Sequence, residues 1–254
     1  MNSLLIFNRR FSVRPAAPLL ALCLVLTLAG PALAQSIYLT PGHLDGVALL
    51  PPPPVPGTAE YQADLNTVRA AYHGRTDADT ARVLKDASLA FSIFEPAIGP
   101  AFDLSKLPKT EAFLKRVKKD VGGTINVPKD FYKRKRPYQV DPALFFGRPE
   151  PSFSYPSGHS TRGTLYSLLL AELFPEHRDA ILAMGCTIGW DRVQLGVHFP
   201  TDIYAGRVLG KALMHELMAS KRFQHDLAEA KAEIAAAEAA PASLEKTTAV
   251  LPGN

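Results

Sequence analysis

Apolar residues recur at spacings of three and four along most of the chain, which is the period of an amphipathic helix. Alternation of apolar and polar residues, the pattern of a half-buried strand, is almost absent. The pattern predicts helices over 59–72, 76–94, 160–174, 176–190, 200–219 and 222–238. With short loops between them and no internal repeat, these helices predict an all-α fold in a single compact multi-helix domain.

A further helix is predicted within 109–123, where Phe113, Val117 and Val121 share one face and Gly122 would end the helix. The stretch 138–158 differs, because it is rich in proline and has no helical period. Long loops without secondary structure in a compact domain tend to be functional. The sequence therefore directs attention to this loop and to the segments that flank it.

The two ends of the chain differ in composition from the rest. Residues 1–34 combine three arginines, an apolar run over 18–30 and small residues before Gln35, which is typical of a secretory signal peptide cleaved near Ala34. A membrane anchor is the alternative, but the apolar run is short and no anchoring charges follow it. We therefore expect a signal peptide over 1–34, a folded domain over 35–240 and a flexible tail over 241–254.

Removal of the signal peptide changes the charge of the protein. The formal net charge is +4, but residues 1–34 contain three arginines and no acidic residue, so 35–254 would carry +1. This balance does not indicate a nucleic-acid partner. No later segment has the length of apolar sequence that a membrane span needs, so no membrane association is expected after cleavage. Cys186 would be the only remaining cysteine, which excludes an intrachain disulfide, and its apolar neighbours predict a small buried residue.

The first candidate cluster is the basic segment KDFYKRKRP over 129–137. Lys129 and Arg136 lie seven residues apart and can share a helix face, whereas Arg134 and Lys135 would point elsewhere. Taken alone, this segment is equally typical of a solvated basic helix face.

The second cluster is Ser157-Gly158-His159, directly before an apolar helical run. Ser157 is a good N-cap, and Gly158 allows a ligand to approach the backbone closely. The first N–H groups of a helix have no intrahelical partner and the helix dipole is positive there, so the cluster predicts an anion site with His159 at its rim. Taken alone, a plain helix cap explains these residues as well.

The third cluster is WDRVQLGVHFPTD over 190–202. Because Pro200 suits the first turn of a helix, His198 would lie just before that helix and Asp202 inside its first turn. A carboxylate there can accept a hydrogen bond from the imidazole and leave the other ring nitrogen free to attack, or it can serve only as a charge favoured by the dipole. Arg192 adds a forked donor for phosphate oxygens.

Together, the three clusters supply what phosphoryl transfer needs: cations and N–H donors for the phosphate oxygens, a nucleophile and an acid for the leaving group. The two histidines and the aspartate would also suit a metal ion. The strong cations beside them would repel such an ion, so we expect neither a metal nor another cofactor.

The order and spacing of these residues resemble the three-part signature of the type 2 phosphatidic acid phosphatase (PAP2) superfamily. The three parts are Lys129-x6-Arg136-Pro137, Pro156-Ser157-Gly158-His159 and Arg192-x5-His198-x3-Asp202. The wider chain, from YLTPGHLDGVALLPPPP to FQHDLAEAKAEI, is similar to the bacterial class A non-specific acid phosphatases.

This resemblance implies the PAP2/haloperoxidase type of fold and a periplasmic acid phosphatase that hydrolyses nucleotides, sugar phosphates or aryl phosphates without a metal, in a homo-oligomer. His198 would form a phosphohistidine, Asp202 would orient it, and His159 would protonate the leaving group. The phosphate would be held by Lys129, Arg136, Ser157, Gly158 and Arg192.

One residue departs from the family pattern, which usually has serine where this chain has Asp191. Its carboxylate either pairs with Arg192 and weakens phosphate binding, or points away and anchors a neighbouring lysine. Three other functions remain as alternatives: a membrane lipid phosphatase, a vanadium-dependent haloperoxidase, and a helical phosphate-binding protein that has lost catalysis.

Overall fold

The structure, a computed structural model, describes residues 36–40, 42–85, 89–145 and 148–239. The predicted signal peptide, the tail over 241–254 and the cleavage position lie outside these residues. The described helices fall in one unit that begins at Ser36. No strand occurs in the four described ranges, which agrees with the all-α prediction.

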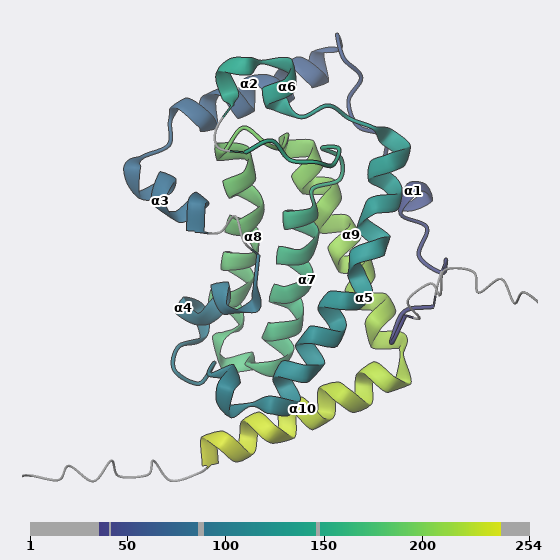
Figure 1. The fold of residues 1–254 in the computed structure, drawn as a ribbon, viewed down its shortest axis with the longest axis vertical. Coiled ribbons are helices and arrows are strands. Elements are labelled where there is room, and N and C mark those ends of the chain that lie inside the picture. Colours follow the sequence, from purple (N-terminus) through teal and green to yellow (C-terminus); the bar gives the residue numbers. More distant parts are fainter. Residues whose placement is uncertain (1–35, 41, 86–88, 146–147, 240–254) are drawn as a thin grey trace, which may run out of the picture. The chain divides into compact units, whose positions relative to one another are not determined.

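The helices follow one another with short connections (Figure 1). Their bounds are α1 Gly46–Leu49, α2 Ala59–His73, α3 Asp77–Lys85, α4 Glu95–Ile98, α5 Pro108–Tyr132, α6 Pro137–Val140, α7 Gly158–Leu173, α8 Arg178–Gln194, α9 Pro200–Ala219 and α10 Lys221–Ala239. Short 3-10 turns lie at Phe91–Phe94, Leu104–Lys106, Pro142–Leu144 and Pro175–His177. The predicted helices over 160–174, 176–190, 200–219 and 222–238 are therefore confirmed.

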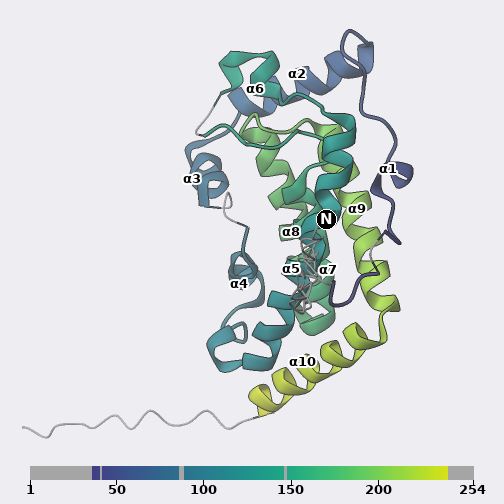
Figure 2. The same ribbon diagram turned by 45° about the vertical axis from the view of Figure 1, so that its right-hand side comes forward.

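Helix α7 is the centre of the packing, with α8 on one side and α9 on the other (Figure 1). Helix α10 crosses one end of this group, and α2 and α6 lie at the opposite end, as both views show (Figure 2). Within the described residues, no helix combines the length and the apolarity that a membrane crossing requires.

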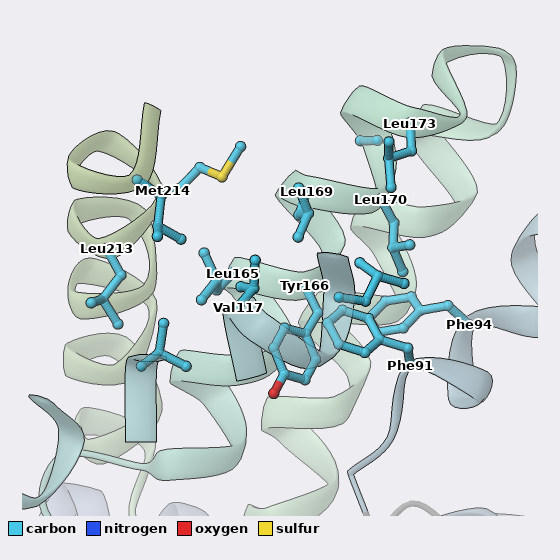
Figure 3. Packing of buried hydrophobic residues seen from close by; sticks show 14 of the residues in the cluster. Phe91, Phe94, Val117, Leu165, Tyr166, Leu169, Leu170, Leu173, Leu213 and Met214 are labelled. Atoms are coloured by element: carbon cyan, nitrogen blue, oxygen red, sulfur yellow. The ribbon is translucent and has the colours of Figure 1, made fainter. Parts of the chain in front are cut away.

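The apolar positions of α7 and α9 meet those of α5 and the 3-10 turn Phe91–Phe94 in the main core. Figure 3 shows the rings of Phe91 and Tyr166 side by side, and their centroids are 4.1 Å apart. Leu165, Leu169 and Leu213 are completely buried in the same cluster. The apolar residues that recur every three to four positions in the sequence are thus the residues that contact the core.

Two glycines allow α9 to approach the first turns of α7. A Cβ on Gly206 would lie 2.7 Å from the carbonyl oxygen of Ser157, and one on Gly210 would lie 2.6 Å from that of Thr161. Both distances are shorter than real Cβ contacts, so any larger residue would separate the helices. The close approach brings the start of α9 against the start of α7, where the second and third sequence clusters lie.

The prediction that Gly122 ends a helix is wrong, because α5 continues to Tyr132. An interior glycine costs a helix about 1 kcal/mol relative to alanine. The apolar stripe continues across the glycine, from Val121 before it to Ile125 after it, and both side chains are almost completely buried. Burial of one such side chain contributes about 1.5–3 kcal/mol, which exceeds the cost of the glycine.

The predicted helix over 76–94 is also partly wrong. Helix α3 ends at Lys85, and the chain then forms the 3-10 turn Phe91–Phe94 before α4. Phe91 and Phe94 are three residues apart and both are buried, so the tighter turn places both rings in the core.

The predicted burial of Cys186 is wrong as well. This residue is exposed on α8, although its neighbours in sequence are apolar.

Candidate active site

A pocket of about 110 Å³ lies at the end of α7 that faces α2 and α6. Its walls come from α5, from the loop before α7, from the first turns of α7 and from the segment before α9. They are formed by Ile125, Asn126, Lys129, Arg136, Glu150, Ser152, Gly158, His159, Arg162 and His198. The structure therefore brings residues of all three sequence clusters into one cavity.

Lys129 and Arg136 both line this pocket, but they do not share a helix face as predicted. Helix α5 ends at Tyr132, and Lys133 takes a left-handed conformation with φ of 49°, so the chain turns before Arg136. The loop before α7 instead aligns the two cations. The Lys129 ammonium donates to the carbonyl oxygen of Phe153, and Arg136 Nε donates to that of Ser152 at 2.9 Å.

The start of α7 has the predicted capped geometry. The Ser157 side chain accepts a hydrogen bond from the Ser160 N–H at 3.3 Å, which makes Ser157 the N-cap. Gly158 is the first helical residue and lines the pocket together with half-buried His159. The positive end of the α7 dipole therefore faces the cavity.

His198 and Asp202 meet as the sequence predicts. His198 Nδ1 is 3.2 Å from Asp202 Oδ2, and Asp202 is completely buried. On the other side of the ring, Arg136 Nη1 lies 3.2 Å from His198 Nε2. Because an arginine can only donate and a carboxylate can only accept, these partners assign the proton to Nδ1 and a lone pair to Nε2. The lone pair is on the nitrogen that faces the pocket cations.

Asp202 is itself fixed by several further bonds. Its Oδ2 accepts from Ser154 Oγ at 2.5 Å and from the Phe199 N–H at 2.9 Å. These bonds hold the carboxylate in one orientation. Because His198 Nδ1 contacts this carboxylate, the orientation of the imidazole is fixed as well.

Burial and nearby cations shift the acid–base properties of two site residues. Burial lowers the pKa of His198 well below its ordinary value, and the charges of Arg136 and Lys129 lower it further. Burial also lowers the pKa of Lys129 to about 7, with the charge of Arg136 adding to the effect. A neutral imidazole and a charged ammonium therefore coexist between the pKa of His198 and that of Lys129.

Comparison with known proteins places this geometry in a family. The model of the PAP2 superfamily matches residues 121–225, which include all three clusters. A non-specific acid phosphatase of Providencia stuartii is 32% identical over 210 residues, which cover 76% of this chain and 82% of the relative. This chain belongs to the PAP2 superfamily.

Two further comparisons give proteins to which this chain is similar. A non-specific acid phosphatase of Salmonella typhimurium is 30% identical over 200 residues, which cover 73% of this chain and 78% of the relative. Among solved structures, a transmembrane PAP2 type phosphatidylglycerolphosphate phosphatase from Bacillus subtilis aligns with a TM-score of 0.45 at 26% identity, covering 64% of this chain and 87% of that chain.

Arg134 is a buried residue of this PAP2 site that the sequence interpretation directed elsewhere. It donates to Asp202 Oδ1 at 2.6 Å and to Asp64 Oδ2 at 2.7 Å, and its guanidinium lies 3.9 Å from the centre of the Phe199 ring. No signal in the sequence marks it, because Arg134, Lys135 and Arg136 are three consecutive cations; only in the structure are they buried, exposed and buried in turn. This alternating burial is typical of extended chain rather than of a helix.

Glu150 and Arg162 also line the pocket and were not predicted. Glu150 Oε1 accepts a hydrogen bond from Arg192 Nη2 at 2.5 Å. Arg192 and Ser157 are buried and are not among the residues that line the cavity. Arg192 contacts Glu150, which lines it, and Ser157 directly precedes Gly158, which also lines it.

Asp191 points away from Arg192, which decides between the two orientations considered for it. Its Oδ1 accepts from Arg82 Nε at 3.1 Å and from Arg82 Nη2 at 3.0 Å. The anchored residue is therefore an arginine of α3 rather than a lysine. Among the described residues, no three histidine, cysteine, aspartate or glutamate side chains gather as metal ligands would.

Proposed function

We propose that this protein hydrolyses phosphate monoesters of broad specificity through a phosphohistidine on His198, without a metal ion, in the periplasm. As a member of the PAP2 superfamily with non-specific acid phosphatases as relatives, the chain is an acid phosphatase, a phosphoric monoester hydrolase. The substrates fitting a pocket of about 110 Å³ are those that insert little more than the phosphate group, such as nucleotides, sugar phosphates and aryl phosphates.

The observation that carries the proposal is the pair of contacts on the His198 ring. Nδ1 faces Asp202 Oδ2 at 3.2 Å, and Nε2 faces the pocket beside Arg136. An imidazole held in this tautomer presents a lone pair to phosphorus, and its lowered pKa keeps that lone pair available in acid.

The proposed reaction has two displacements at phosphorus. In the first, His198 Nε2 forms a bond to phosphorus, the bond to the leaving oxygen breaks, and His159 gives that oxygen a proton. In the second, His159 takes a proton from water, the water oxygen bonds to phosphorus, and the bond to Nε2 breaks to release inorganic phosphate. Asp202 stabilises the imidazolium that attack creates.

The remaining site residues would hold the phosphate oxygens. Lys129 and Arg136 at the pocket wall, and Arg192 next to Glu150, would supply positive charge. The backbone N–H groups at the start of α7 would supply hydrogen bonds, with Ser157 and Gly158 placing them. Between the lowered pKa of His198 and the Lys129 pKa of about 7, Lys129 is charged while His198 is neutral, so the shifts favour activity in mild acid. The composition of residues 1–34, which is typical of a signal peptide, and the resemblance to class A acid phosphatases support export, and we expect a homo-oligomer as in that class.

Replacement of the nucleophile tests the mechanism. We expect His198→Ala to lower kcat for an aryl phosphate by at least about four orders of magnitude, because no other group forms the covalent intermediate. The wild type should trap acid-labile phosphate from a labelled substrate, and the variant should not. His215→Ala, an exposed histidine on α9, is the matched control and should keep full activity.

Two results would contradict the proposal. Full activity of His198→Ala would exclude the phosphohistidine. Loss of wild-type activity in excess chelator, restored by added metal, would exclude the metal-independent reaction.

A further inference from the structure

One carboxylate stands among the cations of the phosphate pocket. Glu150 is the single acidic residue among those that line the cavity, and its Oε1 accepts from Arg192 Nη2 at 2.5 Å. The Arg192 side chain is only 4% exposed, whereas that of Glu150 is 31% exposed. The carboxylate therefore sits between solvent and a buried guanidinium.

Arg192 has donor capacity left beyond this contact. Its Nε is buried and has no hydrogen-bond partner among the described residues. A buried guanidinium N–H without an acceptor is costly, and a phosphate group with several oxygens would satisfy it. The Arg192 guanidinium is thus paired with Glu150, but not all of its N–H donors have an acceptor.

The backbone that carries Glu150 is fixed, so only its side chain needs to move. The Glu150 N–H donates to the Tyr138 hydroxyl at 3.0 Å, and Tyr138 is buried. Pro149 and Pro151 flank the residue, and proline restricts both its own φ and the conformation of the residue before it. Rotation of the glutamate side chain is sufficient to remove the carboxylate from Arg192.

We propose that Glu150 is an exchangeable counter-ion of Arg192: it pairs with the guanidinium in the empty site, gives way to phosphate, and returns as inorganic phosphate leaves. This inference rests on the proposed function, because it requires phosphate to bind in this pocket. Carboxylate and phosphate oxygens compete for the same guanidinium donors, and their negative charges repel one another. Glu150 therefore weakens the binding of substrate and product phosphate and limits product inhibition.

The test is the affinity for inorganic phosphate of the full-length wild type and of Glu150→Gln, measured by isothermal titration calorimetry. The amide keeps the shape of the side chain and removes its charge. We expect the dissociation constant of phosphate to fall about tenfold, the size of one charge-assisted hydrogen bond. The KM and the product-inhibition constant should fall with it, while kcat changes less.

Glu172→Gln is the matched control. Glu172 is 38% exposed and pairs with Lys231 at 3.2 Å, between α7 and α10. The same change of glutamate to glutamine, at a glutamate of similar exposure in an ion pair away from the pocket, should leave phosphate affinity unchanged.

Thermal unfolding separates exchange from a merely structural contact. Without phosphate, Glu150→Gln should unfold at a lower temperature than the wild type, because a buried guanidinium has lost its counter-ion. Saturating phosphate should remove this difference, since the ligand takes over the pairing. A purely structural role would lower the unfolding temperature equally with and without phosphate, and would overturn the inference.

An unchanged or weaker phosphate affinity in Glu150→Gln would overturn the inference while leaving the proposed function intact. If the wild type neither binds phosphate nor hydrolyses phosphate esters, the proposed function itself fails, and the inference fails with it.

Discussion

Asp191 and Asp202 are both completely buried, lie at the two sides of one turn between α8 and α9, and each pairs with an arginine. Asp202 uses both oxygens: Oδ1 accepts from Arg134, and Oδ2 accepts from Ser154 and the Phe199 backbone beside His198. For Asp191, by contrast, Oδ1 contacts Arg82 and Oδ2 has no partner among the described residues. Burial and an arginine partner are therefore not enough to identify a carboxylate that orients a catalytic histidine. Such a carboxylate is identified by its contact with the imidazole and by hydrogen bonds to both of its oxygens.

The arginine partners differ in the same way. The Arg134 side chain is 5% exposed, whereas that of Arg82 is 38% exposed. Arg134 bridges two carboxylates, Asp202 and Asp64, and Asp64 also accepts from the Thr201 N–H at 3.1 Å. Helix α2 thereby supports the start of α9, while the Arg82 pair attaches α3 to α8.

The largest expected effect separates the two carboxylates directly. Asp202→Asn should lower kcat for an aryl phosphate by about three to four orders of magnitude, because an amide no longer fixes the reactive tautomer of His198. Asp191→Asn, the matched variant, should change kcat by less than about threefold, since Asp191 does not touch the reacting groups. Steady-state kinetics on both variants, with circular dichroism to confirm folding, gives the comparison. Equal losses would mean that Asp191 acts on Arg192 after all.

The arginines provide a second, smaller contrast. Lysine keeps the charge of Arg134 but offers a single ammonium, which cannot bridge Asp202 and Asp64 as the guanidinium fork does. We expect Arg134→Lys to lower kcat about ten- to hundredfold through misplacement of His198, with less change in KM. Arg82→Lys should stay within about twofold of the wild type.

Stability measurements accompany this second contrast. Removal of the charge in Arg134→Ala leaves two buried carboxylates unpaired, which should cost about 3–5 kcal/mol in the free energy of unfolding. Arg82→Ala breaks a half-exposed pair and should cost less. A kcat of Arg134→Lys equal to that of the wild type would show that Arg134 contributes only to stability.

These contrasts explain which parts of the molecule could be predicted from sequence. Helices α7 to α10 follow from the apolar period, since their core contacts repeat every three to four residues. The pairing of His198 with Asp202 is also local, because the two residues are four apart at a helix start.

The errors arose where the partner lies far along the chain. Arg134 is 70 residues from Asp64, and Arg82 is 109 residues from Asp191, so no local pattern indicates either pair. Lys129 and Arg136 were assigned to one helix face because their spacing permits it. The left-handed residue Lys133 ends that helix, and the loop over 152–154 aligns the two cations instead.

The smallest expected effect concerns the charge of Lys129. Burial and Arg136 lower the pKa of Lys129 to about 7, and the charge of Asp202 opposes this shift. Asp202→Asn removes the opposing charge, so it should lower this pKa further, and the ammonium should lose its proton at lower pH. Asp191→Asn should leave this pKa unchanged, because Asp191 faces Arg82. Heteronuclear NMR titration of the lysine side chains, assigned with Lys129→Arg, measures both values. If the pKa of Lys129 changed equally in the two variants, both carboxylates would act electrostatically on the phosphate pocket. Only the effect of Asp202 on the tautomer of His198 would then distinguish Asp202 from Asp191.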